Sequence, residues 1–138
     1  MNGPSFGTAK TTGLDYFLVS DYGVGTEIGV LMVSTARDPN SPNSTSVLRA
    51  GLVLGKVTAS SKYKQYDNAA ADGSEVAAGF LRHSIDLRDA AGTQQDTPAV
   101  MITVCEVSTA KIPASGANYT GLDANAITDL AGKTIVRT

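Results

Sequence analysis

The chain has 138 residues, of which 42% are hydrophobic and 17% charged, and its formal net charge is −2. This composition predicts one folded domain with a modest core and excludes a disordered or highly charged chain. The lysines and arginines are scattered singly, so there is no basic stripe to neutralise phosphates and no direct nucleic-acid partner is expected. No apolar run approaches the length of a membrane span, and residues 1–13 contain no apolar segment of a secretory signal, so no membrane partner is expected.

The first residues differ from the rest of the chain. Residues 1–13 are rich in Gly, Ser and Thr, and Lys10 is their only charged side chain. Such a segment buries too little apolar surface to offset the entropy lost on ordering. We therefore predict a flexible N-terminal arm over residues 1–13 and a single β-rich domain over residues 14–138.

Two strands and a loop are expected in the first third of the domain. Residues 14–20 (LDYFLVS) and residues 27–34 (EIGVLMVS) are apolar runs typical of strands. Residues 36–46 (ARDPNSPNSTS) contain two prolines and several Asn and Ser residues. These residues disfavour regular pairing, so an exposed loop is predicted there.

The middle of the chain predicts short strands separated by polar connections. Residues 48–60 predict one or two strands, and residues 62–67 alternate polar and aromatic side chains as a strand does. Residues 68–81 predict a loop that becomes extended from residue 76, and residues 83–97 a polar connection around a weak strand. Residues 98–107 (PAVMITVCEV) are the strongest strand candidate, apolar on both faces and therefore expected to be central.

One helix is predicted near the C-terminus, within GLDANAITDLAGK. Asp123 is a good N-cap, and Leu122 and Ile127 stand at the two positions of a hydrophobic staple. Gly132 stands where a left-handed residue ends a helix, and residues 134–137 (TIVR) predict a final short strand. The predicted fold class is mainly β, a β-rich α+β domain with one short C-terminal helix.

The stretch GLVLGKV in residues 51–57 resembles a phosphate-binding loop, but its spacing is wrong. That motif needs four residues between its glycines and a Ser or Thr after the lysine. Here three apolar residues separate Gly51 from Gly55, and Val57 follows Lys56. A buried strand with two glycines is favoured, each glycine allowing a tight turn or a close backbone approach.

The sequence predicts no catalytic, cofactor-binding or metal-binding residue, and the protein is not expected to be an enzyme. His83 is the only histidine and Cys105 the only cysteine, and a pair this far apart does not form a zinc site. His83 is interpreted as a surface or interface residue, and Cys105, in an apolar run, as a buried structural thiol. Asp67, Asp72 and Glu75 lack the spacing of a calcium loop. They are interpreted as turn residues, with Glu75 solvated or paired to one of two lysines, Lys62 or Lys64.

A longer ordered pattern resembles the lambda-type head decoration, or capsid-stabilising, proteins of tailed bacteriophages. Its densest part is Ala50-Gly51, Val53-Leu54-Gly55-Lys56-Val57-Thr58-Ala59, Lys62-Tyr63, Tyr66-Asp67 and Asp72-Gly73-Ser74-Glu75-Val76-Ala77-Ala78-Gly79. Flanking matches are Phe17-Leu18-Val19-Ser20, Pro98-Ala99-Val100, Glu106-Val107 and Ile135-Val136-Arg137. The resemblance covers most of residues 14–137. The loop at 36–46 looks like an extension, and tryptophan, common in the later part of the family's sequences, is absent.

The resemblance implies a β-clip-like fold and a homotrimer that binds the major capsid protein on the outer surface of the mature head. Such trimers would sit at local threefold positions and stabilise the head against the pressure of packaged DNA, without a cofactor. Leu14, Tyr16, Phe17, Leu18 and Val19 are the predicted capsid contacts, added as a strand to a sheet edge of the shell. The alternative is that residues 14–20 are the first strand of the protein's own core.

Two other classes of function stay open at this point. One is a different structural virion component, such as a tail-tube or fibre-base protein. The other, less favoured, is a small ligand-binding or hydrolytic β-domain, since fold alone does not fix function. A deep polar pocket with converging ionisable groups would favour the second.

Overall fold

The computed structural model describes residues 17–20, 26–108, 112 and 122–137. The predicted flexible arm, residues 1–13, lies outside these ranges. The elements, in chain order, are β1 (Ile28–Met32), β2 (Val47–Leu48), β3 (Val53–Lys56), β4 (Tyr63–Gln65), β5 (Ala77–Leu81), β6 (Ile85–Asp86), β7 (Thr97–Ile102), β8 (Cys105–Ser108), α2 (Ala124–Asp129) and β9 (Thr134–Arg137). The prediction of a mainly β fold with one short helix near the C-terminus is confirmed. The described helix is too short and too polar to cross a membrane.

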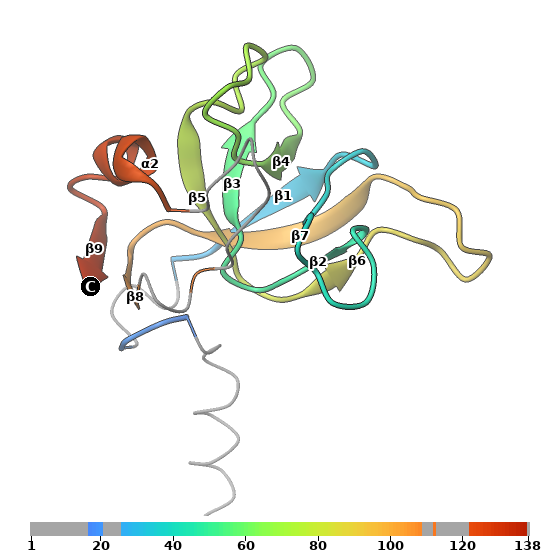
Figure 1. Cartoon of the computed structure of the whole chain (residues 1–138), viewed down its shortest axis with the longest axis horizontal. Coiled ribbons are helices and arrows are strands. Elements are labelled where there is room, and N and C mark those ends of the chain that lie inside the picture. Colours follow the sequence, from blue (N-terminus) through green and yellow to red (C-terminus); the bar gives the residue numbers. More distant parts are fainter. Residues whose placement is uncertain (1–16, 21–25, 109–111, 113–121, 138) are drawn as a thin grey trace, which may run out of the picture.

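Five strands form a closed barrel in the order β1-β4-β3-β5-β7. Neighbouring strands are antiparallel except β1 and β4, which run parallel and pair at Met32 and Tyr63. The longest ladder joins β1 to β7 through five consecutive pairs, from Ile28 with Met101 to Met32 with Thr97. In Figure 1 the barrel occupies the centre, α2 and β9 lie to the left, and the connection between β6 and β7 projects to the right.

The two glycines of GLVLGKV have the structural roles predicted for them. Gly51 has φ +90°, a left-handed conformation that glycine adopts without steric cost. A Cβ on Gly55 would lie 2.4 Å from the carbonyl oxygen of Ser74. Because a backbone segment occupies that space, Gly55 is required for the close packing of β3 on the loop before β5.

The apolar run at residues 98–107 forms two strands, β7 and β8, where a single strand was predicted. The break comes at Thr103, whose Oγ1 donates to the carbonyl oxygen of Ala78 at 3.0 Å. The Thr103 carbonyl in turn accepts a hydrogen bond from the Thr134 hydroxyl at 2.5 Å. The prediction of burial on both faces was also wrong for the start of β7, where Pro98 is exposed.

β8 leaves the barrel and forms a second, smaller sheet that we call the end sheet. It pairs in parallel with β9, from Cys105 with Thr134 to Ser108 with Arg137. On its other side β8 is bridged by Leu18, which lies opposite Val107 in antiparallel orientation. The end sheet thus consists of residues 17–19, β8 and β9, with β8 in the middle.

The helix α2 is fixed to the barrel at both ends. At its start, Asp123 Oδ1 accepts a hydrogen bond from Ala126 N at 2.8 Å, as an N-cap does. The same oxygen accepts a second bond, at 2.9 Å, from the hydroxyl of the buried Tyr66. At the other end, Asp129 Oδ2 accepts from Ala77 N of β5 at 2.9 Å. The predicted cap is therefore confirmed, and it also joins the helix to the residue that follows β4.

The loop at residues 36–46 contains no helix or strand, as predicted, but it is not exposed throughout. Asp38 is fully buried. Its carboxylate accepts hydrogen bonds from Arg49 Nε at 2.6 Å and Arg49 Nη2 at 2.7 Å, while its backbone N–H donates to the carbonyl of Thr45 at 2.8 Å. A partly buried ion pair with two parallel hydrogen bonds therefore holds this loop against the residue that follows β2.

Candidate functional site: interaction surfaces

The three carboxylates near residue 70 serve local structure. Asp72 forms an ion pair with Lys64 at 2.7 Å, and this bond lowers the pKa of Asp72 well below its ordinary value. Glu75 accepts a hydrogen bond from Gly73 N at 2.8 Å and is partly exposed, whereas Lys64 pairs with Asp72 and Lys62 with Asp96. Within the described ranges, no three His, Cys, Asp or Glu side chains are placed to hold a metal ion.

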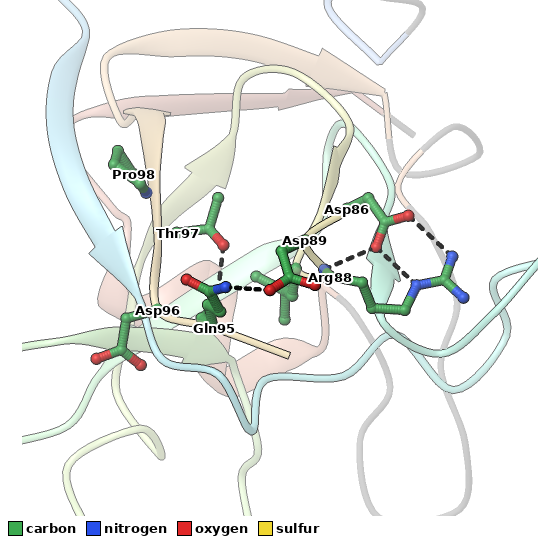
Figure 2. Close-up of a pocket in the computed structure, with 8 residues that line it drawn as sticks. Asp86, Arg88, Asp89, Gln95, Asp96, Thr97 and Pro98 are labelled. Atoms are coloured by element: carbon green, nitrogen blue, oxygen red, sulfur yellow. Dashed lines mark hydrogen bonds and ion pairs between the residues drawn. The ribbon is translucent and has the colours of Figure 1, made fainter. Parts of the chain in front are cut away.

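The pocket in Figure 2 lies where the connection between β6 and β7 returns to the barrel. Its volume is about 150 Å³, and it is lined by Asp86, Leu87, Arg88, Asp89, Gln95, Asp96, Thr97 and Pro98. Its three carboxylates form ion pairs or hydrogen bonds with neighbouring side chains. Asp86 pairs with Arg88 at 2.8 Å, which lowers the pKa of Asp86 to about 2. Asp89 accepts from Gln95, and Asp96 pairs with Lys62.

These bonds matter for the hydrolytic alternative. An acid–base pair needs two groups whose environments push their pKa values apart, so that one is protonated while the other is ionised. Here hydrogen bonds lower the pKa of Asp86, Asp89 and Asp96 alike. All three carboxylates stay ionised at neutral pH, and this pocket gives no support to hydrolytic chemistry.

The histidine and the cysteine lie in different surroundings. His83 is exposed, and Cys105 is fully buried in the end sheet. Burial raises the pKa of the Cys105 thiol to about 11. The prediction of a buried structural thiol is confirmed.

Native Cys105 is therefore expected to resist alkylation at pH 8. A pKa near 11 leaves the thiol protonated at that pH, and only the thiolate reacts. Labelling of the folded protein by iodoacetamide should be at least about a hundredfold slower than labelling in 8 M urea, where the pKa returns to its ordinary value. Mass spectrometry gives both rates, with Cys105→Ala as the background control. Rapid stoichiometric labelling of the folded protein would contradict the burial.

The predicted contact residues of the N-terminal segment are placed in three different ways. Leu14 and Tyr16 lie outside the described residues. Phe17 is fully buried and Leu18 is 9% exposed, both within the hydrophobic core. Val19 is 49% exposed. For Phe17 and Leu18 the burial favours the alternative, in which this segment is part of the protein's own core.

The backbone of this segment is held by β8. Val19 N donates to the carbonyl of Glu106 at 2.8 Å, and Ser108 N donates to the carbonyl of Phe17 at 3.1 Å. Side chains alternate between the two faces of a sheet. Leu18 lies in register with Val107 and Val136 on the buried side, so the next row, Val19 with Glu106 and Ile135, is on the outer side.

In this outer row two exposed apolar side chains, Val19 and Ile135, lie on either side of Glu106. Ile135 is 39% exposed and faces the same side as Val19. Ile135 was not among the predicted contact residues. The alternation in TIVR signals a strand, but only the pairing of β9 with β8 shows that Ile135 joins the row of Val19.

The described part of the molecule is a small barrel with paired charges, a fixed helix and an end sheet in which Val19 and Ile135 are exposed. Residues 23–135 match the family described as bacteriophage lambda head decoration protein D. The match covers most of the chain, and the chain belongs to this family. No curated protein and no solved structure matches it significantly.

Membership identifies the protein as a structural component of the phage capsid. It also supports the resemblance noted from residues 14–137, since the match includes the whole of the dense segment at 50–81. The loop at 36–46 lies inside the matched range and is held in place by the pair of Asp38 and Arg49.

Proposed function

We propose that the protein binds the outer surface of the mature head as a homotrimer at local threefold positions, and stabilises the head against the pressure of packaged DNA. Its partner is the major capsid protein, and it acts without catalysis. The observation that carries the proposal is the match to the head decoration family over residues 23–135.

The mechanism is thermodynamic linkage. A protein that binds the assembled shell and not its separated subunits stabilises the shell by its free energy of binding. A trimer touches several shell subunits at once, so individually weak contacts combine through a high effective concentration. No bond-making step is required.

The N-terminal segment supplies part of the contact. Phe17 and Leu18 attach the segment to its own domain, and the hydrogen bonds of Phe17 and Val19 to β8 fix its direction. Phe17, where residues 1–16 join the domain, is thereby held beside the outer row of the end sheet. Leu14 and Tyr16, with Val19, are the residues we assign to the shell contact, and about 13 residues can reach roughly 40 Å.

Deletion of residues 2–16 tests this assignment while keeping Phe17 and Leu18 in the core. The truncated protein should fold, because no residue of the described core is removed. Its affinity for expanded, undecorated heads should fall at least about tenfold, since burial of one large apolar side chain contributes roughly 1.5–3 kcal/mol.

Co-sedimentation with heads measures the affinity, and thermal melting of both proteins controls for folding. Val19→Glu is a matched point variant, because it alters the exposed side chain beside the segment and leaves the core intact. Unchanged decoration by the truncated protein would show that the segment makes no shell contact.

A further inference from the structure

A chemically labile pair of residues lies in the connection between β4 and β5, residues 66–76, at the top of Figure 1. Asp72-Gly73 is the only Asp-Gly pair in the chain. In such a pair the glycine nitrogen can attack the aspartate side chain, because glycine has no side chain to obstruct the approach and leaves the backbone the most freedom. Isomerisation of aspartate is therefore expected to be fastest at this pair when the chain is unfolded.

The isomerisation has two steps and leaves the composition of the chain unchanged. Gly73 N bonds to Asp72 Cγ, and a carboxyl oxygen leaves as water with the carboxyl proton and the amide proton, which gives a cyclic imide. A water molecule then adds at the main-chain carbonyl carbon of Asp72, gives its proton to Gly73 N and breaks the bond between them. The backbone now passes through the side chain of residue 72 and is longer by an atom. The first step needs a protonated carboxyl group that is free to turn towards Gly73 N.

The folded structure opposes both of these requirements. Asp72 Oδ2 accepts a hydrogen bond from Lys64 Nζ at 2.7 Å, and Oδ1 accepts from Ser74 N at 3.0 Å and from Ser74 Oγ at 2.6 Å. These bonds fix the orientation of the carboxyl group, and they lower the pKa of Asp72 so that the group is ionised. Gly73 N donates to Glu75 Oε2 at 2.8 Å, so the attacking nitrogen is also held in a charge-assisted hydrogen bond.

The packing around Gly73 excludes any other residue at this position. Gly73 has φ +104°, which only glycine adopts without steric cost. An added Cβ would lie 2.5 Å from the carbonyl oxygen of Lys56 and would also collide with Thr58 Oγ1. Asp72 is tied to the same turn, since its carbonyl accepts from Thr58 N at 2.8 Å. The fold therefore requires the labile glycine and cannot lose the risk by replacing it.

Isomerisation at this pair would disturb the barrel. Ser74, the next residue along the chain, is fully buried, and its carbonyl oxygen lies directly against Gly55 of β3. A longer backbone at residue 72 would displace this contact. A component of an assembled capsid is not renewed by synthesis, so such damage would accumulate for as long as the particle persists.

We propose that Asp72-Gly73 is a latent isomerisation site, and that Lys64 and Ser74 keep it unreacted in the folded protein by holding the Asp72 carboxylate. This protection is separate from the proposed function, because it needs no contact with the head. It is measured on the purified protein alone.

Lys64→Met tests the protection most directly. It removes the ammonium group and keeps most of the side-chain length, and the pair with Asp72 is partly exposed, so the protein should stay folded. Lys62→Met is the matched control, because Lys62 pairs with Asp96, which is followed by Thr97 and not by glycine. Asp72→Glu identifies the signal, since the longer side chain does not readily form the cyclic imide.

The measurement is the rate at which isoaspartate appears at residue 72 at mildly acidic pH, by mass spectrometry with electron-transfer fragmentation. Thermal melting tests the folding of each variant. Folded wild type and Lys62→Met should react at least about tenfold more slowly than the chain in concentrated urea, and folded Lys64→Met about tenfold faster than folded wild type. The reason is that each unit by which the pKa of the carboxyl group rises increases its protonated fraction about tenfold. Ser74→Ala, which removes one donor and keeps the backbone, should also react faster than wild type.

Three results would overturn the proposal. The first is a folded wild type that isomerises as fast as the chain in urea, and the second is a folded Lys64→Met that is no faster than wild type. The third is a Lys62→Met that is as fast as Lys64→Met. That result would assign the acceleration to general loosening of the barrel and not to release of the Asp72 carboxylate.

Discussion

Replacement of Phe17 by alanine is expected to destabilise the native state by about 3–5 kcal/mol, the range for large aromatic side chains in a core. Phe17 is fully buried, and its ring centre lies 6.0 Å from that of Phe80. It also fills the space beside Gly51, where an added Cβ would lie 2.9 Å from Phe17 Cγ. The cavity left by alanine is bordered by the barrel and the end sheet, so both would lose packing.

Urea unfolding followed by circular dichroism measures this effect, and the melting temperature should fall by roughly 10 °C or more. Val19→Ala is the matched control in the same segment, because Val19 is 49% exposed and its truncation should change stability little. If Phe17→Ala were as stable as the wild type, residues 17–20 would not belong to the core, and Phe17 would again be a candidate for shell contact.

Replacement of Arg49 by alanine is expected to destabilise the protein by about 3 kcal/mol, because it leaves the buried carboxylate of Asp38 without its cation. The Asp38 side chain has no exposed surface and that of Arg49 is 27% exposed. The loop at residues 36–46 should become the first part of the protein to open, since the pair of Asp38 and Arg49 holds it in place.

Hydrogen exchange and limited proteolysis of the loop, together with urea unfolding, check this expectation. Arg88→Ala is the control, because it removes an arginine from the pair with Asp86, in which both side chains are well exposed, and exposed pairs contribute little. Equal stability losses in the two variants would contradict the role assigned to burial.

The parts of the fold that depend on local sequence could be predicted. The cap at Asp123 and the left-handed Gly132, with φ +86°, follow from short-range rules for helix ends. The roles of Gly51 and Gly55 followed from the failure of the phosphate motif and the apolar spacer between them. Each of these predictions needed only a few neighbouring residues.

The parts that depend on distant contacts could not be predicted. The sequence near Thr103 does not indicate that its hydroxyl donates to the Ala78 carbonyl or that its own carbonyl accepts from the Thr134 hydroxyl. The strand break was therefore missed. Asp38 lies in a polar loop sequence, and its burial depends on Arg49, eleven residues later. The apolar pattern at 14–20 suited a core strand as well as a shell-binding strand, and the burial of Phe17 and the pairing of Leu18 with Val107 could not be read from it.

The most direct test of the central claim is to mix the purified protein with expanded, undecorated heads and to image the particles by electron cryo-microscopy. We expect added density on the outer surface at local threefold positions, and decorated heads that survive heating or loss of counterions under which bare heads rupture. Heads that show no added density at saturating protein, or that rupture under the same conditions as bare heads, would contradict the proposal that this protein stabilises the capsid by binding it.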